Sequence, residues 1–134
     1  MIEEKNLVIT IQDEYFSVKQ CNENPMNLYI FGDNSLHYGK KGQAIIRDCD
    51  NSIGIPTKRK PSMSYDAFMR DEKEDYESVA KALKELKERS KHYNNIIFPR
   101  NGIGTGLAMM DKTSPKLFKK LYEVLNINLK DISV

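Results

Sequence analysis

Four short apolar runs, separated by segments with helical periodicity, constrain this fold more than any other feature of the chain. They cover residues 7–11, 28–31, 53–55 and 96–98. Runs that are apolar throughout are typical of strands covered on both faces. Pro56 and Pro99 follow the last two runs, and because proline cannot donate to a sheet ladder, we expect both strands to end there. A last short strand is expected near residues 130–133.

Helical patterns fill the intervals between these runs. Residues 71–93 carry an apolar stripe on one side and oppositely charged i,i+4 pairs on the other, which predicts a long helix. Ser114 and Pro115 have the residue types of a helix cap and a first helical position, so a final helix is expected to begin there. A short helix is expected over residues 43–48. Alternating strands and helices predict an α/β layered sheet, in which ligands bind beyond the carboxyl ends of the strands.

Length and composition limit the class of protein. A chain of 134 residues is the size of one domain, so we expect residues 1–134 to form a single domain. With 40% apolar and 30% charged residues, its composition is that of a globular protein and excludes a disordered one. No apolar run approaches the about 20 residues of a membrane span, and the acidic residues 1–6 do not resemble a signal peptide. We therefore expect a cytoplasmic monomer with no membrane partner.

Charge and cysteine content do not identify a partner by themselves. The net charge is +2, although residues 37–61 hold six basic side chains against two acidic ones. Such a local excess suits a phosphorylated small molecule as readily as nucleic acid. Cys21 and Cys49 are isolated, with no histidine at ligand spacing, so no metal, cofactor or disulfide is expected.

Two glycine-rich loops are the strongest functional signal. The first covers residues 38–44, after the second apolar run, and the second covers residues 99–107, after the fourth run. Because glycine has no Cβ, backbone N–H groups in such loops can form a concave nest that binds an anion. Neither loop has the spacing of a P-loop or a Rossmann fingerprint. Each loop alone is equally consistent with a tight turn, but two loops at neighbouring strand ends favour a binding site.

The order of these features resembles the macrodomains, and it is closest to their branch typified by terminal ADP-ribose protein glycohydrolase. The resemblance covers roughly residues 7–125 and rests on Asn34, the first loop with its Gly-x-x-Gly-x-Ala spacing, the 55–58 segment, and the second loop. It implies a macrodomain-like three-layer α/β/α fold with a central mixed sheet and a cleft for ADP-ribose. The residues that match the two phosphate-facing loops are Gly39, Gly42, Gln43, Ala44, Gly102, Ile103, Gly104, Thr105, Gly106 and Leu107.

The resemblance also implies roles for single residues. Lys58 stands where the glycohydrolase branch has a lysine that attacks the anomeric carbon. Asn34 matches the asparagine near the distal ribose, and Asp13 matches the aspartate that contacts adenine. The partner aspartate expected after the last glycine and a leucine is Ala108 here, which places hydrolysis by a Lys–Asp pair in question. Asp33 and Asp111 are the alternative carboxylates.

Three further residues beside the loops have open roles. The Thr105 hydroxyl is expected either to meet a phosphate or to cap its own loop. Arg100 is expected either to pair with a phosphate or to make a structural pair. His37 has no carboxylate partner apparent in the sequence and is expected either to be solvated or to face a ribose or base of the ligand. The mixed polar and aromatic segment 60–70 is expected to fold over the cleft.

The sequence therefore supports three hypotheses. The first is a module that binds ADP-ribose or a related nucleotide diphosphate, whose enzymatic form removes ADP-ribosyl groups through Lys58. The second is a non-catalytic reader or sponge for the same ligand, which Ala108 favours. The third is a nucleic-acid-binding protein that uses the basic residues 40–60. The expected partner is ADP-ribose or an ADP-ribosylated macromolecule, with nucleic acid expected only as a modified substrate in the first two cases.

Overall fold

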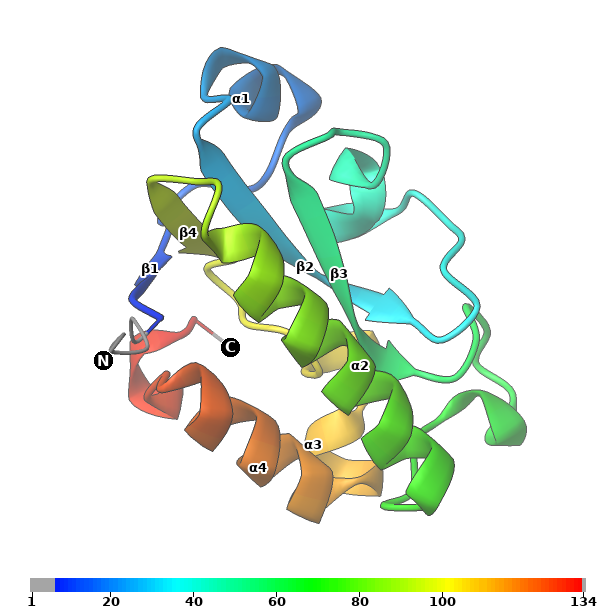
Figure 1. The fold of residues 1–134 in the computed structure, drawn as a ribbon. Helices are drawn as coiled ribbons and strands as arrows, with labels where there is room; N and C mark the ends of the chain where they lie inside the picture. Colours follow the sequence, from blue (N-terminus) through cyan, green and yellow to red (C-terminus); the bar gives the residue numbers. More distant parts are fainter. Residues whose placement is uncertain (1–6, 134) are drawn as a thin grey trace.

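The four expected strands form one sheet, in the order β1–β4–β2–β3 (Figure 1). The computed structural model describes residues 7–133 of the chain, so the amino-terminal residues 1–6 discussed above lie outside it. The strands are β1 (Ile9–Ile11), β2 (Asn27–Asn34), β3 (Ser52–Lys58) and β4 (Asn95–Phe98). An α/β fold is therefore confirmed.

All described strand pairs are parallel, whereas the resemblance implies a mixed sheet. Ile9 is paired with Ile96, Leu28 also with Ile96, and Ile30 with Ile53. Each connection between consecutive strands passes through a helical segment, which returns the chain to the starting edge and makes the next strand parallel. Parallel pairing places all four carboxyl ends at one edge of the sheet.

The expected stop of the third strand at Pro56 is wrong. β3 continues through Pro56 to Lys58, and Pro56 is in register with Asp33 of β2. β3 is the last strand of the sheet, where a missing N–H can face outward. The extension places Lys58 beside Asn34, with one irregularity in register just before that pair.

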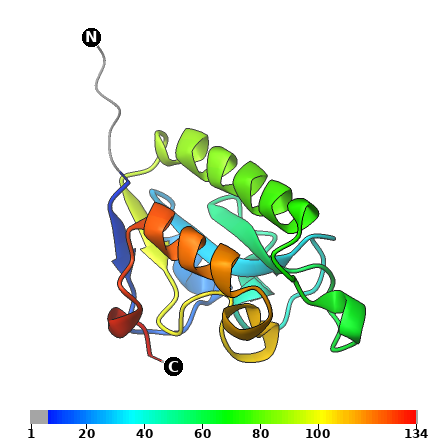
Figure 2. The same ribbon diagram turned by 90° about the horizontal axis from the view of Figure 1, so that it is seen from below.

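Helices cover both faces of the sheet. Alternate residues of β2, such as Leu28 and Ile30, pack in one core with α2 (Lys73–Ser90) and α4 (Pro115–Leu125). Tyr29 and Phe31 point the other way and pack with α1 (Val18–Glu23) and the 3₁₀ helix η1 (Gly42–Ile46). Figure 2 shows α2 and α4 side by side on one side of the sheet. The arrangement has the expected three layers.

The two long helices begin as their sequences suggest, with one difference. Glu72 and Asp75 form a reciprocal capping box at the start of α2. At the start of α4 the Ser114 hydroxyl makes no cap within its own helix. It donates instead to Asp71 at 2.8 Å, and Asp71 accepts from the backbone N–H of Leu117 at 2.9 Å. Asp71 therefore caps α4 from the segment before α2 and joins the two helices.

The strand expected at residues 130–133 is wrong. The chain there forms the 3₁₀ helix η4 (Leu129–Asp131), preceded by an Asn128 side-chain cap. Ser133 then donates its backbone N–H to Arg100 at 2.8 Å, and Ile132 is buried in the core beside α4. The carboxyl-terminal segment therefore packs against the second glycine loop and forms a hydrogen bond to it. Shorter helices are η2 (Tyr65–Ala67), η3 (Gly106–Ala108) and α3 (Met110–Thr113). Within residues 7–133, no helix has both the length and the apolar character needed to cross a membrane.

Candidate functional site

The two glycine loops meet at the carboxyl edge of the sheet, and Gln43 joins them. Its side-chain oxygen accepts from the backbone N–H of Gly32 at 2.8 Å, and its amide nitrogen donates to the carbonyl of Gly102 at 2.7 Å. Gln43 therefore connects the end of β2 to the second loop. A ligand-binding role for Gln43 is a prediction from the resemblance, and the structure places its amide in this bridge.

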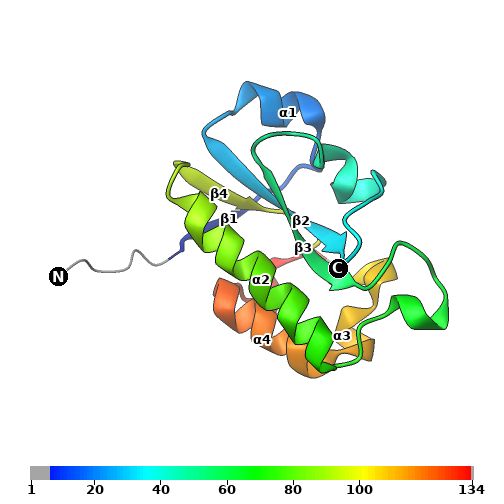
Figure 3. The same ribbon diagram turned by 45° about the vertical axis from the view of Figure 1, so that its right-hand side comes forward.

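A cavity of about 460 Å³ lies at the ends of β2 and β3, and we call it the β2–β3 cavity. Its walls include residues of the first loop, of η3 and of the start of the 60–70 segment. Figure 3 shows β2 and β3 side by side where they end. The cavity contains five of the predicted or alternative site residues from the first half of the chain, together with Leu107 from the second loop and Ala108 directly after it. The residues that line it are Gly32, Asp33, Asn34, Tyr38, Gly39, Lys40, Lys41, Ala44, Arg47, Thr57, Lys58, Pro61, Leu107 and Ala108.

Charged and polar side chains anchor the first loop. Arg47 donates from Nη2 to Asp33 Oδ1 at 2.6 Å and from Nε to the carbonyl of Gly39 at 2.8 Å. Asn34 accepts from the N–H of Leu36 and donates to the carbonyl of Tyr38. The Asn34 amide is thus committed to the loop, although the residue lines the cavity where a distal ribose was expected.

Asp33 is the centre of this anchor. Burial alone would raise the pKa of its carboxyl, but hydrogen bonds from Arg47, His37 and the N–H of Asn34 outweigh burial and lower the pKa. Asp33 is therefore an ionised partner of Arg47 and not a free general base. The alternative carboxylate, Asp111, does not line the β2–β3 cavity.

His37 has a carboxylate partner, contrary to the expectation from the sequence. Its Nδ1 lies 2.9 Å from Asp33 Oδ2, while 61% of its side chain remains exposed. The two residues are four positions apart, but they lie at the end of β2 and not in a helix, so no helical periodicity predicts their contact. A backbone φ of +59° at His37 makes the turn that allows the contact.

The first half of the second loop is packed against α4. Gly102 has a φ of +75°, and a Cβ there would lie 2.6 Å from both the Tyr122 hydroxyl and Ile132 Cδ1. The Ile103 side chain is buried, and its N–H donates to the Tyr122 hydroxyl at 2.9 Å. A Cβ on Gly104 would lie 3.0 Å from Met110 Sδ. These glycines are needed for close packing.

The second half of the same loop is open. The Thr105 hydroxyl donates to the carbonyl of Asn101 at 2.9 Å, which is the capping role considered above. Gly106 has a φ of +61°, and a Cβ there would meet nothing within 4 Å. Within the described part of the chain, the N–H groups of Thr105, Gly106 and Leu107 have no hydrogen-bond partner. These groups are free to meet an anion.

Lys58 occupies the end of β3 and lines the β2–β3 cavity. Its ammonium donates to the carbonyl of Ser62 and lies 4.8 Å from the centre of the Phe68 ring. Burial lowers the pKa of the Lys58 amine. A lysine with a lowered pKa has more of the neutral, nucleophilic form at neutral pH. Ala108 lines the same cavity, so the partner aspartate that the resemblance implies is replaced by an alanine beside Lys58.

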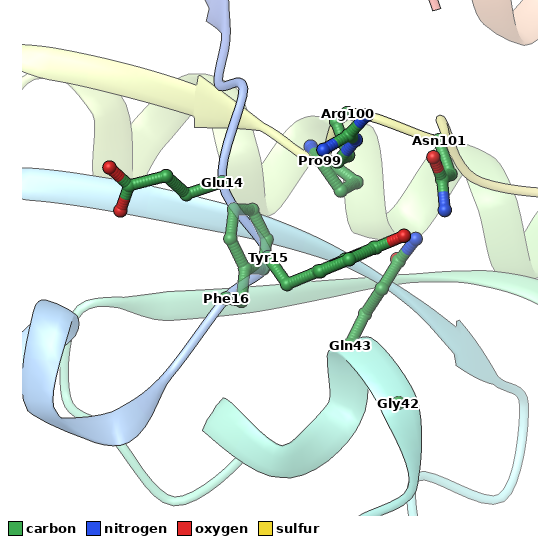
Figure 4. Close-up of a pocket in the computed structure, with 8 residues that line it drawn as sticks. All are labelled: Glu14, Tyr15, Phe16, Gly42, Gln43, Pro99, Arg100 and Asn101. Atoms are coloured by element: carbon green, nitrogen blue, oxygen red, sulfur yellow. The ribbon is translucent and has the colours of Figure 1, made fainter. Parts of the chain in front are cut away.

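A second cavity, of about 250 Å³, lies at the ends of β1 and β4, and we call it the β1–β4 cavity. Figure 4 shows Gln43 extending from η1 toward the 99–101 segment, while the carboxylate of Glu14 points away. Asp13, the predicted adenine contact, is exposed and does not line this cavity, although Glu14 beside it does. The lining residues are Glu14, Tyr15, Phe16, Gly42, Gln43, Pro99, Arg100 and Asn101.

Arg100 forms part of the wall of this second cavity and has a structural role. It donates from Nη1 to the backbone carbonyl of Asp13 at 2.8 Å, and its guanidinium lies 5.2 Å from the centre of the Tyr15 ring. Its Nε is the one buried side-chain polar atom without a hydrogen-bond partner among residues 7–133. An unpaired buried donor is costly, so this atom favours a ligand with an acceptor group.

Sequence reasoning missed three residues of the site. Arg47 was counted only as part of a basic excess, Tyr38 only as the start of a loop, and Gly54 only as part of a strand. A Cβ on Gly54 would lie 2.5 Å from Asp33 Oδ2, so this glycine makes room for the buried carboxylate. A glycine inside an apolar strand is the signal that could have found it.

Comparison with known proteins gives a family without a function. The model of a family described as a family of unknown function (DUF7831) matches residues 11–124. Neither the curated proteins nor the solved structures that were compared with the chain gave a match. Among the described residues, no group of three or more histidine, cysteine, aspartate or glutamate side chains is placed to hold a metal ion.

Proposed function

We propose that this chain, which belongs to the family of unknown function, binds ADP-ribose or a related nucleotide diphosphate. The proposal rests on the geometry of the chain itself. The observation that carries the proposal is the pair of cavities on either side of the first glycine loop. Gly42 and Gln43 line the β1–β4 cavity, while Gly39, Lys40 and Lys41 line the β2–β3 cavity. Two hollows joined by a glycine-rich segment suit a ligand with two bulky ends and a narrow anionic linker.

Each end of such a ligand has a suitable cavity. The β1–β4 cavity offers aromatic rings from Tyr15 and Phe16 and the unpaired Arg100 Nε, a combination that suits a nucleobase with acceptor nitrogens. The larger β2–β3 cavity offers lysine and backbone donors, which suit the distal ribose and phosphate oxygens.

The diphosphate is proposed to lie between the two loops. Free N–H groups at Thr105, Gly106 and Leu107 supply the second loop's donors. Gly39 and Gly42 have φ values of +102° and +58°, in the range where consecutive N–H groups can form an anion-binding concavity. Lys41 lines the β2–β3 cavity beside them and favours an anion electrostatically.

Removal of an ADP-ribosyl group is a second candidate function. Its specific support is the position of Lys58 in the β2–β3 cavity together with the lowered pKa of its amine. Ala108 in the same cavity argues for a reader instead, because no carboxylate stands beside Lys58 on that side. The nucleic-acid hypothesis has less support, since Lys40 and Lys60 are paired with Asp48 and Asp66.

Titration calorimetry with ADP-ribose, ATP, NAD and a short DNA duplex tests the binding proposal. ADP-ribose is expected to bind, and DNA is expected not to. Gly42→Glu should abolish ADP-ribose binding and Gly42→Gln should not, since the two side chains have nearly the same shape and differ in charge. A Cβ at Gly42 meets nothing within 4 Å, so both variants are expected to fold.

A different result would contradict each part of the proposal. Equal binding by the glutamate and glutamine variants would show that no phosphate approaches the first loop. Tight, strongly salt-dependent DNA binding without ADP-ribose binding would favour the nucleic-acid hypothesis. Release of ADP-ribose from a modified peptide by the unaltered protein but not by Lys58→Ala would identify an enzyme, and release by neither would identify a reader.

A further inference from the structure

A buried carboxylate is held between a cation and an imidazole at the rim of the β2–β3 cavity. The Asp33 side chain is 3% exposed, and that of its partner Arg47 is 14% exposed. The third member, His37, reaches Asp33 Oδ2 from the solvent side at 2.9 Å. Arg47 also lies 5.2 Å from the centre of the Phe31 ring, which fixes the guanidinium from below.

Two independent features of the backbone make this arrangement possible. Position 54 must be glycine, because a Cβ there would lie within 3 Å of three atoms of the Asp33 side chain. His37 has a φ of +59°, a left-handed conformation that is uncommon for residues other than glycine. Unfavourable backbone conformations that persist in a fold are concentrated at functional sites. Here the conformation brings the imidazole onto the carboxylate.

The hydrogen bond to Asp33 determines what the imidazole can do. With Nδ1 donating to the carboxylate, Nε2 faces outward and either accepts or donates a proton, depending on the charge of the ring. Asp33 and Asn34 before His37, and Tyr38 after it, all line the cavity. His37 itself is outside the lining of the cavity, but its exposed ring lies one hydrogen bond from the cavity wall, through Asp33.

We propose that His37 is the proton-transfer residue for cleaving ADP-ribose from an alcohol acceptor, such as a serine side chain, in the β2–β3 cavity. This inference rests on the proposed function, and it supplies the group that Ala108 does not. Asp33 cannot fill the role itself, because both of its oxygens are engaged by Arg47 and His37. Asp33 is the positioning residue that orients the ring.

The proposed reaction has two steps. In the first, the neutral amine of Lys58 forms a bond to the anomeric carbon, the bond from that carbon to the serine oxygen breaks, and the imidazolium gives its Nε2 proton to that oxygen. In the second, a water oxygen bonds to the anomeric carbon, the carbon–nitrogen bond breaks, and its electron pair returns to Lys58. Neutral His37 takes the proton released by the water. The products are free ADP-ribose and serine, and both residues are regenerated.

The leaving group gives the sharpest test. A serine alkoxide is a very poor leaving group and needs a proton, whereas a glutamate carboxylate, with an ordinary pKa of about 4.3, leaves without one. His37→Asn keeps a residue that tolerates the left-handed backbone and can donate to Asp33, but it cannot transfer a proton. We expect the single-turnover rate of acceptor release, which reports the first step alone, to fall about 100- to 10,000-fold in the variant on a serine-linked ADP-ribosyl peptide and less than about tenfold on a glutamate-linked one.

Controls separate this inference from the proposed function. ADP-ribose affinity, measured by calorimetry, should be unchanged in His37→Asn. His92→Asn alters the other histidine of the chain, which is exposed in the turn after α2, and should leave both rates unchanged. If the unaltered protein does not bind ADP-ribose, the proposed function fails and this inference fails with it. If it binds but cleaves neither peptide, or if His37→Asn cleaves the serine-linked peptide normally, only this inference is overturned.

A rescue experiment excludes a purely structural role. Glycine adopts the left-handed conformation without cost, so His37→Gly should fold and leave a gap beside Asp33. Free imidazole added to this variant is expected to restore at least about tenfold of the lost serine-linked cleavage, saturably. Unchanged cleavage at all imidazole concentrations, with the melting temperature of the unaltered protein, would overturn the assignment.

Discussion

The two glycine loops look alike in sequence but are built on different physical principles. Ion pairing and hydrogen bonds to Asp33, Asn34 and Arg47 hold the first loop, where a Cβ on Gly42 would meet nothing within 4 Å and one on Gly39 would meet only Pro61, at 3.9 Å. Apolar packing against α4 and the Tyr122 hydroxyl hold the second loop, where Gly102 and Gly104 have no room for a Cβ. A glycine-rich loop at a strand end thus indicates either a ligand nest or a close packing contact. Only the surroundings distinguish the two.

The two loops are expected to differ most in how far a substituted glycine lowers the free energy of unfolding. Gly102→Ala should destabilise the protein by about 2–5 kcal/mol, because it adds an overpacked methyl group to a left-handed residue. Chemical denaturation with urea measures the change. A loss below about 1 kcal/mol would show that the second loop is not fixed by its contact with Tyr122 and Ile132.

The matching substitution in the first loop should cost less. Gly42→Ala adds a methyl group in open space, so only the left-handed backbone is penalised, by about 1–2 kcal/mol. The same urea experiment applies. If Gly42→Ala destabilised the protein as much as Gly102→Ala, the contrast between an open loop and a packed loop would be wrong.

Sequence reasoning found the positions of these loops but not their construction. Pro99 located the end of β4, whereas β3 continues through Pro56 to Lys58. The alternation of strands and helices predicted the layers. The contact of Gly102 with Tyr122 and Ile132 depends on the tertiary placement of α4 and the carboxyl-terminal segment, which no local pattern contains. Likewise, the residues that meet at Asp33 come from a strand end, a tight turn and a short helix. The Asp71–Ser114 contact could not be predicted either, because it joins residues that are 43 positions apart in the sequence.

The smallest expected difference between the two loops is the response of their amide resonances to acid. The pKa of Asp33 is lower in the folded protein than its ordinary value of 3.8, so its interactions stabilise the fold above that pH and are lost as the pH falls below it. The amide resonance of Asn34, which donates to Asp33 Oδ1 at 2.8 Å, should shift with a midpoint below 3.8. The amide of Ile103, bonded to Tyr122, should not shift in that range before global unfolding. A midpoint above 3.8 at Asn34 would contradict the ion pair.

Titration of the ¹⁵N-labelled protein with ADP-ribose, followed by amide resonances, tests the central claim most directly. The N–H groups of Gly39, Gly42, Gly106 and Leu107 are expected to shift together and to saturate with one affinity. The N–H groups of Gly102 and Ile103, already bonded to Pro99 and Tyr122, should move little. Shifts confined to one loop, or no shifts at all, would contradict a diphosphate bound between the two loops.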